Sequence, residues 1–201
     1  CTSCETKARR IPRICLARLA RRPNKDGYYE VDFFKPLNGL KSEDSCDKNW
    51  LPFEDEGEIR VIYDYEPFVV AKVDRNSGMI NPVHKREMPY KLSRFRGSAG
   101  PIDFDRGYLF VIHEVTFRHI NGHWRRYYFH RFVWMDRQYQ LQKISKPFYF
   151  EEKTTEFCSG ICSFVEGGKL ILTCGLKDKE AKAYWVKMDL VRNMLRTIKV
   201  E

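Results

Sequence analysis

Short runs of apolar and β-branched residues, separated by turn residues, recur along most of this chain. The clearest runs are residues 58–63, 108–113, 127–135 and 169–174. Each is bounded by turn residues, as at Gly167-Gly168, and runs of this length and composition predict β-strands. Helical periodicity is weak and is indicated only at residues 11–22. The pattern predicts a nearly all-β fold.

A short signature returns three times near the ends of consecutive strand pairs. It consists of an apolar residue, any residue, Val or Met, and Asp, and its copies end at Asp74, Asp136 and Asp189, roughly 50–60 residues apart. Each Asp falls where a strand ends and a turn begins, so we expect these aspartates to bond the backbone of the turn. A unit of strand, strand, Asp turn and strand is typical of β-propeller blades.

The repeat divides the chain into expected blades. We predict a basic N-terminal segment at 1–26, a partial blade at 27–47, and full blades at 48–95, 96–150 and 151–201. Propellers contain about four to eight blades, so this chain is barely long enough to close a ring.

The net charge of +9 lies mostly at one end of the chain. Residues 1–26 hold eight basic and two acidic residues, a net of +6 that leaves +3 for the rest. Such a segment can bind nucleic acid phosphates or can be a solvated stretch that covers an open end of the fold. We favour the second interpretation, because runs of charge are usually solvated tails or faces.

Seven cysteines, an odd number, argue against a complete set of internal disulfides. Cys1 and Cys4 have the spacing of half a zinc site, but the next close pair, Cys158 and Cys162, lies too far along the chain, so we expect no metal. Cys158, Cys162 and Cys174 lie in apolar runs and are expected to be buried free thiols. This favours a reducing, cytoplasmic-type compartment.

The apolar runs also bear on solubility. The longest, such as residues 108–112, are far shorter than the roughly 20 residues of a membrane-spanning helix, so we expect a soluble protein.

The chain starts with Cys-Thr-Ser-Cys and lacks an initiator Met and the apolar core of a secretion signal. We therefore expect it to be a fragment.

Several segments carry a resemblance to a known family. They are Lys48-Asn-Trp-Leu-Pro-Phe53, Tyr65-Glu-Pro67 with the Asp74 turn, Arg96-Gly-Ser-Ala-Gly-Pro101, Gly107-Tyr-Leu-Phe-Val-Ile-His113, Glu156-Phe-Cys-Ser-Gly160 and Leu172-Thr-Cys-Gly-Leu-Lys-Asp178. In this order they resemble the C-terminal blades of the β-mannoside phosphorylases and their five-bladed β-propeller relatives. The element Tyr128-Phe-His130 is similar to one in the relatives that accompany glycosyltransferases. The resemblance implies a five-bladed propeller of which three to four blades are present here.

The resemblance also implies a central pocket. At matching positions, Lys48 and His113 would hold inorganic phosphate and Asp178 would contact sugar hydroxyls. Arg96, beside glycines that let a ligand approach the backbone, would add a charged fork. The weaker substrate-binding candidates are Tyr128, His130 and Glu156. The competing interpretations are a surface lysine, a core histidine and a plain turn aspartate.

The sequence departs from the pattern of this family at the catalytic residue. The catalytic Asp of the family belongs to a Glu-Asp-Pro-Arg motif that this sequence does not contain, and Glu66-Pro67 is not equivalent. Glycoside cleavage needs a proton donor, and hydrolysis needs a second carboxylate, so the catalytic residues stay unknown.

The sequence leaves two main functions open. The first is a carbohydrate-binding propeller that works beside a glycosyltransferase, with a glycan or sugar as its partner. The second is a fragment of a glycoside phosphorylase or hydrolase whose catalytic Asp lies outside this chain. A third function, nucleic-acid binding through the basic N-terminal segment, ranks lower because charged and aromatic residues lie in separate parts of the chain. We expect no cofactor, with inorganic phosphate the candidate co-substrate, and no membrane as a partner.

Overall fold

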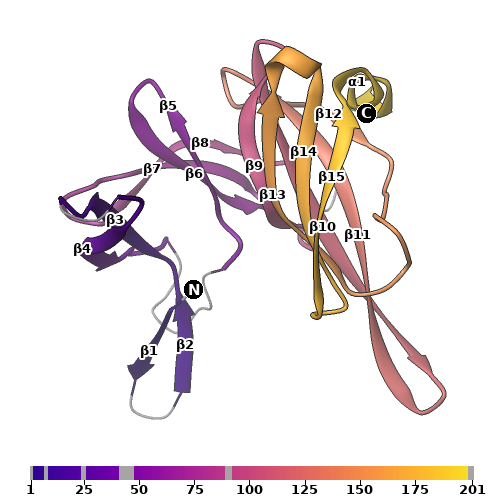
Figure 1. The fold of residues 1–201 in the computed structure, drawn as a ribbon, viewed down its shortest axis with the longest axis horizontal. Coiled ribbons are helices and arrows are strands. Elements are labelled where there is room, and N and C mark those ends of the chain that lie inside the picture. Colours follow the sequence, from indigo (N-terminus) through magenta and orange to yellow (C-terminus); the bar gives the residue numbers. More distant parts are fainter. Residues whose placement is uncertain (1, 7–8, 24–25, 41–47, 89–91, 199–201) are drawn as a thin grey trace.

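A computed structural model describes residues 2–6, 9–23, 26–40, 48–88 and 92–198. In these ranges the chain is almost entirely antiparallel β-sheet, with one short α-helix, as Figure 1 shows. The prediction of an all-β fold is confirmed. None of the sheets in the described ranges closes on itself.

Two hairpins begin the chain. Their strands are β1 (Thr2–Thr6) with β2 (Arg9–Arg13), and β3 (Cys15–Arg21) with β4 (Tyr29–Pro36). The helical periodicity at 11–22 is therefore not realised, because β3 pairs with β4 along its whole length. The expected boundary at residue 26 falls in the turn between these two strands, so β3 belongs with the strand that follows it.

Basic residues in β3 and directly after it have partners on β4. Arg18 forms an ion pair with Asp32 at 2.9 Å, and Arg22 forms one with Glu30 at 2.9 Å. Part of the positive charge of the N-terminal segment is thus neutralised across the hairpin. Lys7 and Lys25, which also contribute to that charge, lie outside the described residues.

Three meandering sheets follow. The first contains β5 (Leu51–Asp55), β6 (Glu58–Tyr65), β7 (Phe68–Val73) and β8 (Ile80–Arg86). The second contains β9 (Arg96–Phe104), β10 (Gly107–Ile120), β11 (His123–Asp136) and β12 (Leu141–Ser145). The third contains β13 (Glu156–Phe164), β14 (Lys169–Leu176) and β15 (Glu180–Lys187), with the 3-10 turn η1 (Val165–Gly167) between β13 and β14. The strands predicted at 58–63, 108–113, 127–135 and 169–174 are confirmed.

The end of the chain departs from the expected repeat. Helix α1 (Met188–Met194) follows β15 directly, and β16 (Leu195–Thr197) then pairs with β12 of the preceding sheet. Asp189 lies in the first turn of α1 and pairs with Arg192 at 2.6 Å, so it does not end a strand as Asp74 and Asp136 do. In the described ranges no helix is long and apolar enough to cross a lipid bilayer.

The other two repeat aspartates have the predicted role. The Oδ1 atom of Asp74 accepts bonds from two backbone N–H groups of the following turn, at 2.9 and 2.6 Å. Oδ1 of Asp136 does the same at 3.0 and 2.8 Å. These carboxylates satisfy turn donors that would otherwise lack a partner.

The sheets stack face to face because successive strand residues point to opposite sides. On β10, Phe110 packs towards the sheet of β5–β8, while Leu109 and Val111 pack towards the sheet of β13–β15. A third core lies between β5–β8 and the hairpin β3–β4 and includes Val61 and Val69. The first strands of three consecutive sheets lie side by side, with β5 against β9 and β9 against β13.

Three cysteines were expected to be buried, and one is not. Cys158 and Cys174 are fully buried free thiols, whereas Cys162 is exposed. A bulge in β13 between Cys158 and Gly160 adds one residue to the alternation and moves Cys162 to the outer face of the sheet. Ile161 takes the inward position instead.

Candidate functional site

An open cleft of about 970 Å³ lies where the first strands of the three sheets begin. Its basic lining residues are Lys48, Arg94, Arg96 and Arg126. Its ring-bearing lining residues are His113, Phe117, Tyr128 and Phe157. No Asp or Glu is among the described residues that line it. The cleft is therefore a cationic and aromatic surface.

A tight junction between two strands brings Lys48 and Arg96 together. Asn49 has a φ of 62°, a left-handed conformation that Asn tolerates, and its amide nitrogen donates to the carbonyl of Gly97 at 3.1 Å. A Cβ atom on Gly97 would lie 2.4 Å from the carbonyl oxygen of Asn49, so only glycine fits there. Lys48 and Arg96, which directly precede Asn49 and Gly97, line the same cleft.

The Arg96 guanidinium is held by its own loop. One terminal nitrogen, Nη1, donates to the backbone carbonyls of Ser93 and Phe95, each at 2.7 Å. Arg96 is nevertheless exposed. A guanidinium that is fixed by backbone carbonyls and still open to solvent can bind an anion with little further ordering.

His113 forms the floor of the cleft. Its Nδ1 atom is 2.8 Å from the Ser98 hydroxyl, and its ring stacks on Tyr128 with ring centroids 5.5 Å apart. Phe157 meets the same ring edge-on at 5.3 Å. These contacts fix the orientation of the imidazole and leave Nε2 as the ring nitrogen for a ligand.

A second histidine lies beneath the first. His130 is fully buried, its ring centroid is 6.3 Å from that of His113, and its Nε2 atom accepts the backbone N–H of Cys158 at 3.2 Å. Burial, with a smaller contribution from the charges of Arg96 and Lys48, lowers the pKa of His113 to about 4. Burial and the neighbouring His113 lower the pKa of His130 to about 3. Both rings are therefore neutral at pH 7.

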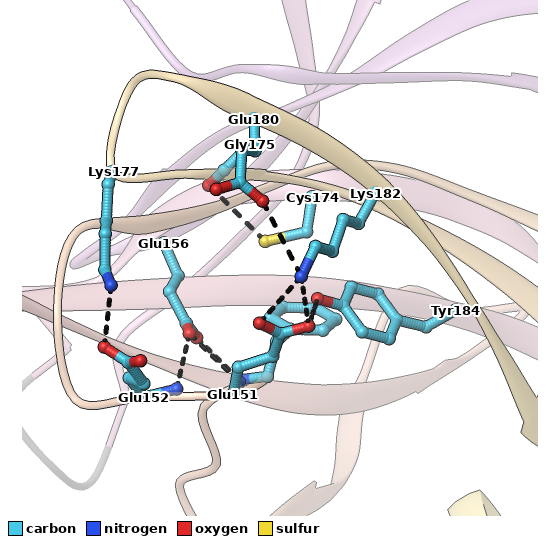
Figure 2. Close-up of polar contacts among 10 residues, drawn as sticks. Glu151, Glu152, Glu156, Cys174, Gly175, Lys177, Glu180, Lys182 and Tyr184 are labelled. Carbon is cyan, nitrogen blue, oxygen red and sulfur yellow. Dashed lines mark hydrogen bonds and ion pairs between the residues drawn. The ribbon is translucent and has the colours of Figure 1, made fainter.

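Glu156 does not face the cleft but holds the loop beside it. Its buried carboxylate accepts the backbone N–H groups of Phe150 at 2.6 Å, Glu151 at 3.0 Å and Glu152 at 2.8 Å. Figure 2 shows this carboxylate among the polar residues of the loop and of β14 and β15. Because Phe157 comes next in the chain, Glu156 fixes the point from which that ring enters the cleft.

Asp178 lies at the rim. Lys177 and Asp178 have φ values of 54° and 55°, left-handed conformations within the three-residue turn 177–179 between β14 and β15. The Asp178 carboxylate is exposed and lies 3.7 Å from the guanidinium of Arg126, a cleft residue. Lys177 pairs with Glu152 at 2.9 Å, which ties this turn to the loop held by Glu156 (Figure 2).

The structure thus divides the seven residues named from the sequence into those that line the cleft and those that do not. Those that line the cleft are Lys48, Arg96, His113 and Tyr128. Asp178 is at the rim, and His130 and Glu156 support the cleft from below and behind. Sequence reasoning missed the lining residues Arg94, Phe117, Arg126 and Phe157. Basic and aromatic residues are mixed at 117–127, contrary to the expectation that they lie in separate parts of the chain, and this mixture was the signal for two of them.

The chemistry of the cleft suits binding of an anion with an apolar face. Cations bind phosphate or carboxylate groups, and the rings of Tyr128 and Phe157 offer flat apolar surfaces. In the ranges that the structure describes, no group of three or more His, Cys, Asp or Glu residues could hold a metal ion.

Comparison with known proteins gave no relative: no protein family model matches the chain, and no match was found among curated protein sequences.

Proposed function

We propose that this chain is a carbohydrate-binding module of the β-propeller type whose cleft takes a glycan that bears an anionic group. The observation that carries the proposal is the convergence of three consecutive sheets on one cleft. Lys48 precedes the first strand of one sheet, Arg96 begins the first strand of the next, and Phe157 lies on the first strand of the third.

The arrangement of the sheets supports the propeller part of the proposal. In a propeller, the first strand of each blade lies nearest the axis, and neighbouring blades bury their faces against one another. Here β5, β9 and β13 lie side by side, and cores fill the spaces between successive sheets. The five-bladed type rests on the resemblance of the segments to the β-mannoside phosphorylase family.

The lining of the cleft supports binding rather than bond cleavage. Four cationic side chains and several rings suit a charged sugar, while the described lining offers no carboxylate as a proton donor. Asp178 at the rim is a carboxylate that can accept bonds from sugar hydroxyls. The proposed role beside a glycosyltransferase rests on the resemblance of the Tyr128-Phe-His130 element alone.

A second candidate is a fragment of a glycoside phosphorylase. It is favoured by the meeting of Lys48 and His113 in the cleft, since these are the positions that the resemblance assigns to inorganic phosphate. In this case the catalytic Asp would come from outside the chain. Glycan binding that requires inorganic phosphate would favour this second candidate.

The test is isothermal titration of the purified chain with a uronic acid, a sugar phosphate and a neutral methyl glycoside. We expect the two anionic sugars to bind and the neutral one to bind at least about tenfold more weakly, because each charged contact contributes on the order of 1.4 kcal/mol. Lys48→Gln should weaken anionic binding by about tenfold. Lys85→Gln, on the exposed part of β8 outside the cleft, is the control and should bind like the parent.

Two results would contradict the proposed function or the proposed site. If the folded chain binds none of the three sugars, with or without phosphate, the carbohydrate proposal is wrong. If Lys48→Gln and Lys85→Gln weaken binding equally, attraction to the overall positive charge explains the result, and the cleft is not the site.

A further inference from the structure

The hairpin β10–β11 extends well beyond the sheet to which it belongs. Both strands are 14 residues long and remain paired from Gly107 with Asp136 to Ile120 with His123. Figure 1 shows its distal half projecting away from the neighbouring sheets. The projecting half carries large exposed side chains, with Phe117 60% and Trp124 72% exposed.

One face of this hairpin continues the cleft. Cross-strand pairs of an antiparallel ladder share a face, and every second pair lies on the same side. The pairs on the side of His113 are Val115 with Tyr128, Phe117 with Arg126, and His119 with Trp124. We name these six residues the cleft-side face, and four of them, Val115, Phe117, Arg126 and Tyr128, also line the cleft.

The opposite face of the hairpin has a different composition. Its distal pairs are Thr116 with Tyr127, Arg118 with Arg125, and Ile120 with His123. Arg118 lies over the ring of Tyr127 at 5.9 Å. The two arginines on this face provide charges at the same distance along the hairpin as Arg126 but directed away from the cleft.

The aromatic side chains of the cleft-side face lie at different distances from the cleft along the hairpin. Tyr128 and Trp124 are four residues apart on one strand, which corresponds to about 13 Å, and Phe117 lies between them on the partner strand. The edge of the His119 ring meets Trp124 with centroids 5.3 Å apart and holds the indole against the ladder. A single sugar ring cannot contact Tyr128 and Trp124 together, whereas a chain of sugars can.

We infer that the cleft-side face is an extended subsite along which an anionic oligosaccharide lies, with one end of the oligosaccharide in the cleft. This inference rests on the proposed function and deepens it from a single sugar to a chain. Phe117 and Trp124 stack on successive sugar rings, and Arg126 binds an anionic group between them.

Charge and chemistry favour an acidic glycan over a single-stranded nucleic acid. Asp178 lies 3.7 Å from Arg126 and leaves an exposed carboxylate beside the path of the ligand. That carboxylate can accept hydrogen bonds from the free hydroxyls of a sugar chain, whereas the sugar-phosphate backbone of DNA has no hydroxyl to donate.

The test measures affinity against ligand length. The probes are uronic acid oligosaccharides from the monosaccharide to the hexasaccharide, and their affinities are measured by isothermal titration calorimetry. For the parent chain we expect affinity to rise by about tenfold or more from the shortest to the longest probe. In Trp124→Ala this gain should disappear, while affinity for the monosaccharide and the melting temperature stay the same, because Trp124 is mostly exposed.

Two matched controls test whether the effect is specific to the cleft-side face. Trp185→Ala removes another exposed indole, 58% exposed on β15, and should keep the full gain with length. Arg126→Gln should reduce binding of long probes by about tenfold, while Arg125→Gln, on the opposite face of the same hairpin, should not.

The possible results distinguish failure of the extended subsite from failure of the proposed function. Binding of short probes without any gain in affinity with length overturns the extended subsite and leaves the proposed function standing. Equal losses in Arg125→Gln and Arg126→Gln, or tighter binding of oligothymidylate than of the hexasaccharide, also overturn it. Binding of no probe of any length overturns both.

Discussion

At the residue scale, the two histidines beneath the cleft make stability depend on pH. The pKa values of about 4 for His113 and about 3 for His130 lie below the value of about 6.5 expected in the unfolded chain. Between these values the unfolded state binds more protons than the folded state. The free energy of unfolding therefore falls as the pH falls from about 6.5 towards 4.

Urea unfolding at pH 7 and pH 5 tests this prediction. The parent should be less stable at pH 5, and His113→Asn, which removes one of the two groups, should show a smaller loss. His123→Asn, at the exposed tip of the hairpin, is the control and should lose as much stability as the parent. Equal losses in all three proteins would show that His113 is not the source of the pH dependence.

Four residues named from the sequence lie together in the candidate cleft. Lys48, Arg96, His113 and Tyr128 were named from motifs, and all four line the cleft. Arg126 and Phe157 were not named, because their positions depend on the length of a hairpin and on a loop that Glu156 holds. Hydrophobic patterning alone gives neither the extent of strand pairing nor the partners of a buried carboxylate.

At the element scale, Gly97 fixes how closely two first strands approach. We expect Gly97→Ala to destabilise the chain by about 1–3 kcal/mol, because the new Cβ atom overlaps the carbonyl of Asn49 and the side chain of Leu51. Displacement of Asn49 also moves Lys48, so ligand binding should weaken as well.

Gly175→Ala is the matched control for this prediction. Gly175 lies within β14, and a Cβ atom there meets nothing within 4 Å, so stability should change by less than about 0.5 kcal/mol. The two free energies of unfolding are measured by urea titration. If both variants match the parent, the junction between β5 and β9 is looser than the structure indicates.

Strands were easier to predict than the connections between them. The apolar runs predicted β6, β10, β11 and β14, and the Asp turns at Asp74 and Asp136 lie where two further hairpins begin. The helical periodicity at 11–22 and the strand end expected at Asp189 were wrong predictions. β3 pairs with β4 in the first segment, and in the second the chain forms α1 before β16 pairs with β12. The pairing of β16 with β12 is non-local and leaves little trace in a short window of sequence.

At the scale of the whole molecule, the sheets differ in how many of their faces are covered. The sheets of β5–β8 and β9–β12 contact a core on each side, whereas β13–β15 contacts one on its inner side. The outer face of β13–β15 exposes Trp185, and β3–β4 exposes Leu19 and Val31. Stacked units of this kind are held by contacts with their neighbours, so the units at each end open first.

Amide hydrogen exchange measured by mass spectrometry tests this order. Peptides from β6, β7, β10 and β11 should exchange slowest, and those from β3, β4 and β15 should exchange fastest. The projecting part of the hairpin β10–β11 is excluded from the comparison, since it lies outside the stack (Figure 1). Uniform protection across all of these strands would contradict the prediction and indicate a single cooperative unit.

The position of Phe157 links the cleft to the sheet at the end of the stack. A ligand that contacts both Arg96 and Phe157 binds only when β13 is docked against β9, so occupancy of the cleft and docking of β13–β15 favour one another. This linkage is reciprocal. A substitution that loosens the core around Leu170 and Leu172 therefore lowers affinity for a ligand that those two side chains never touch.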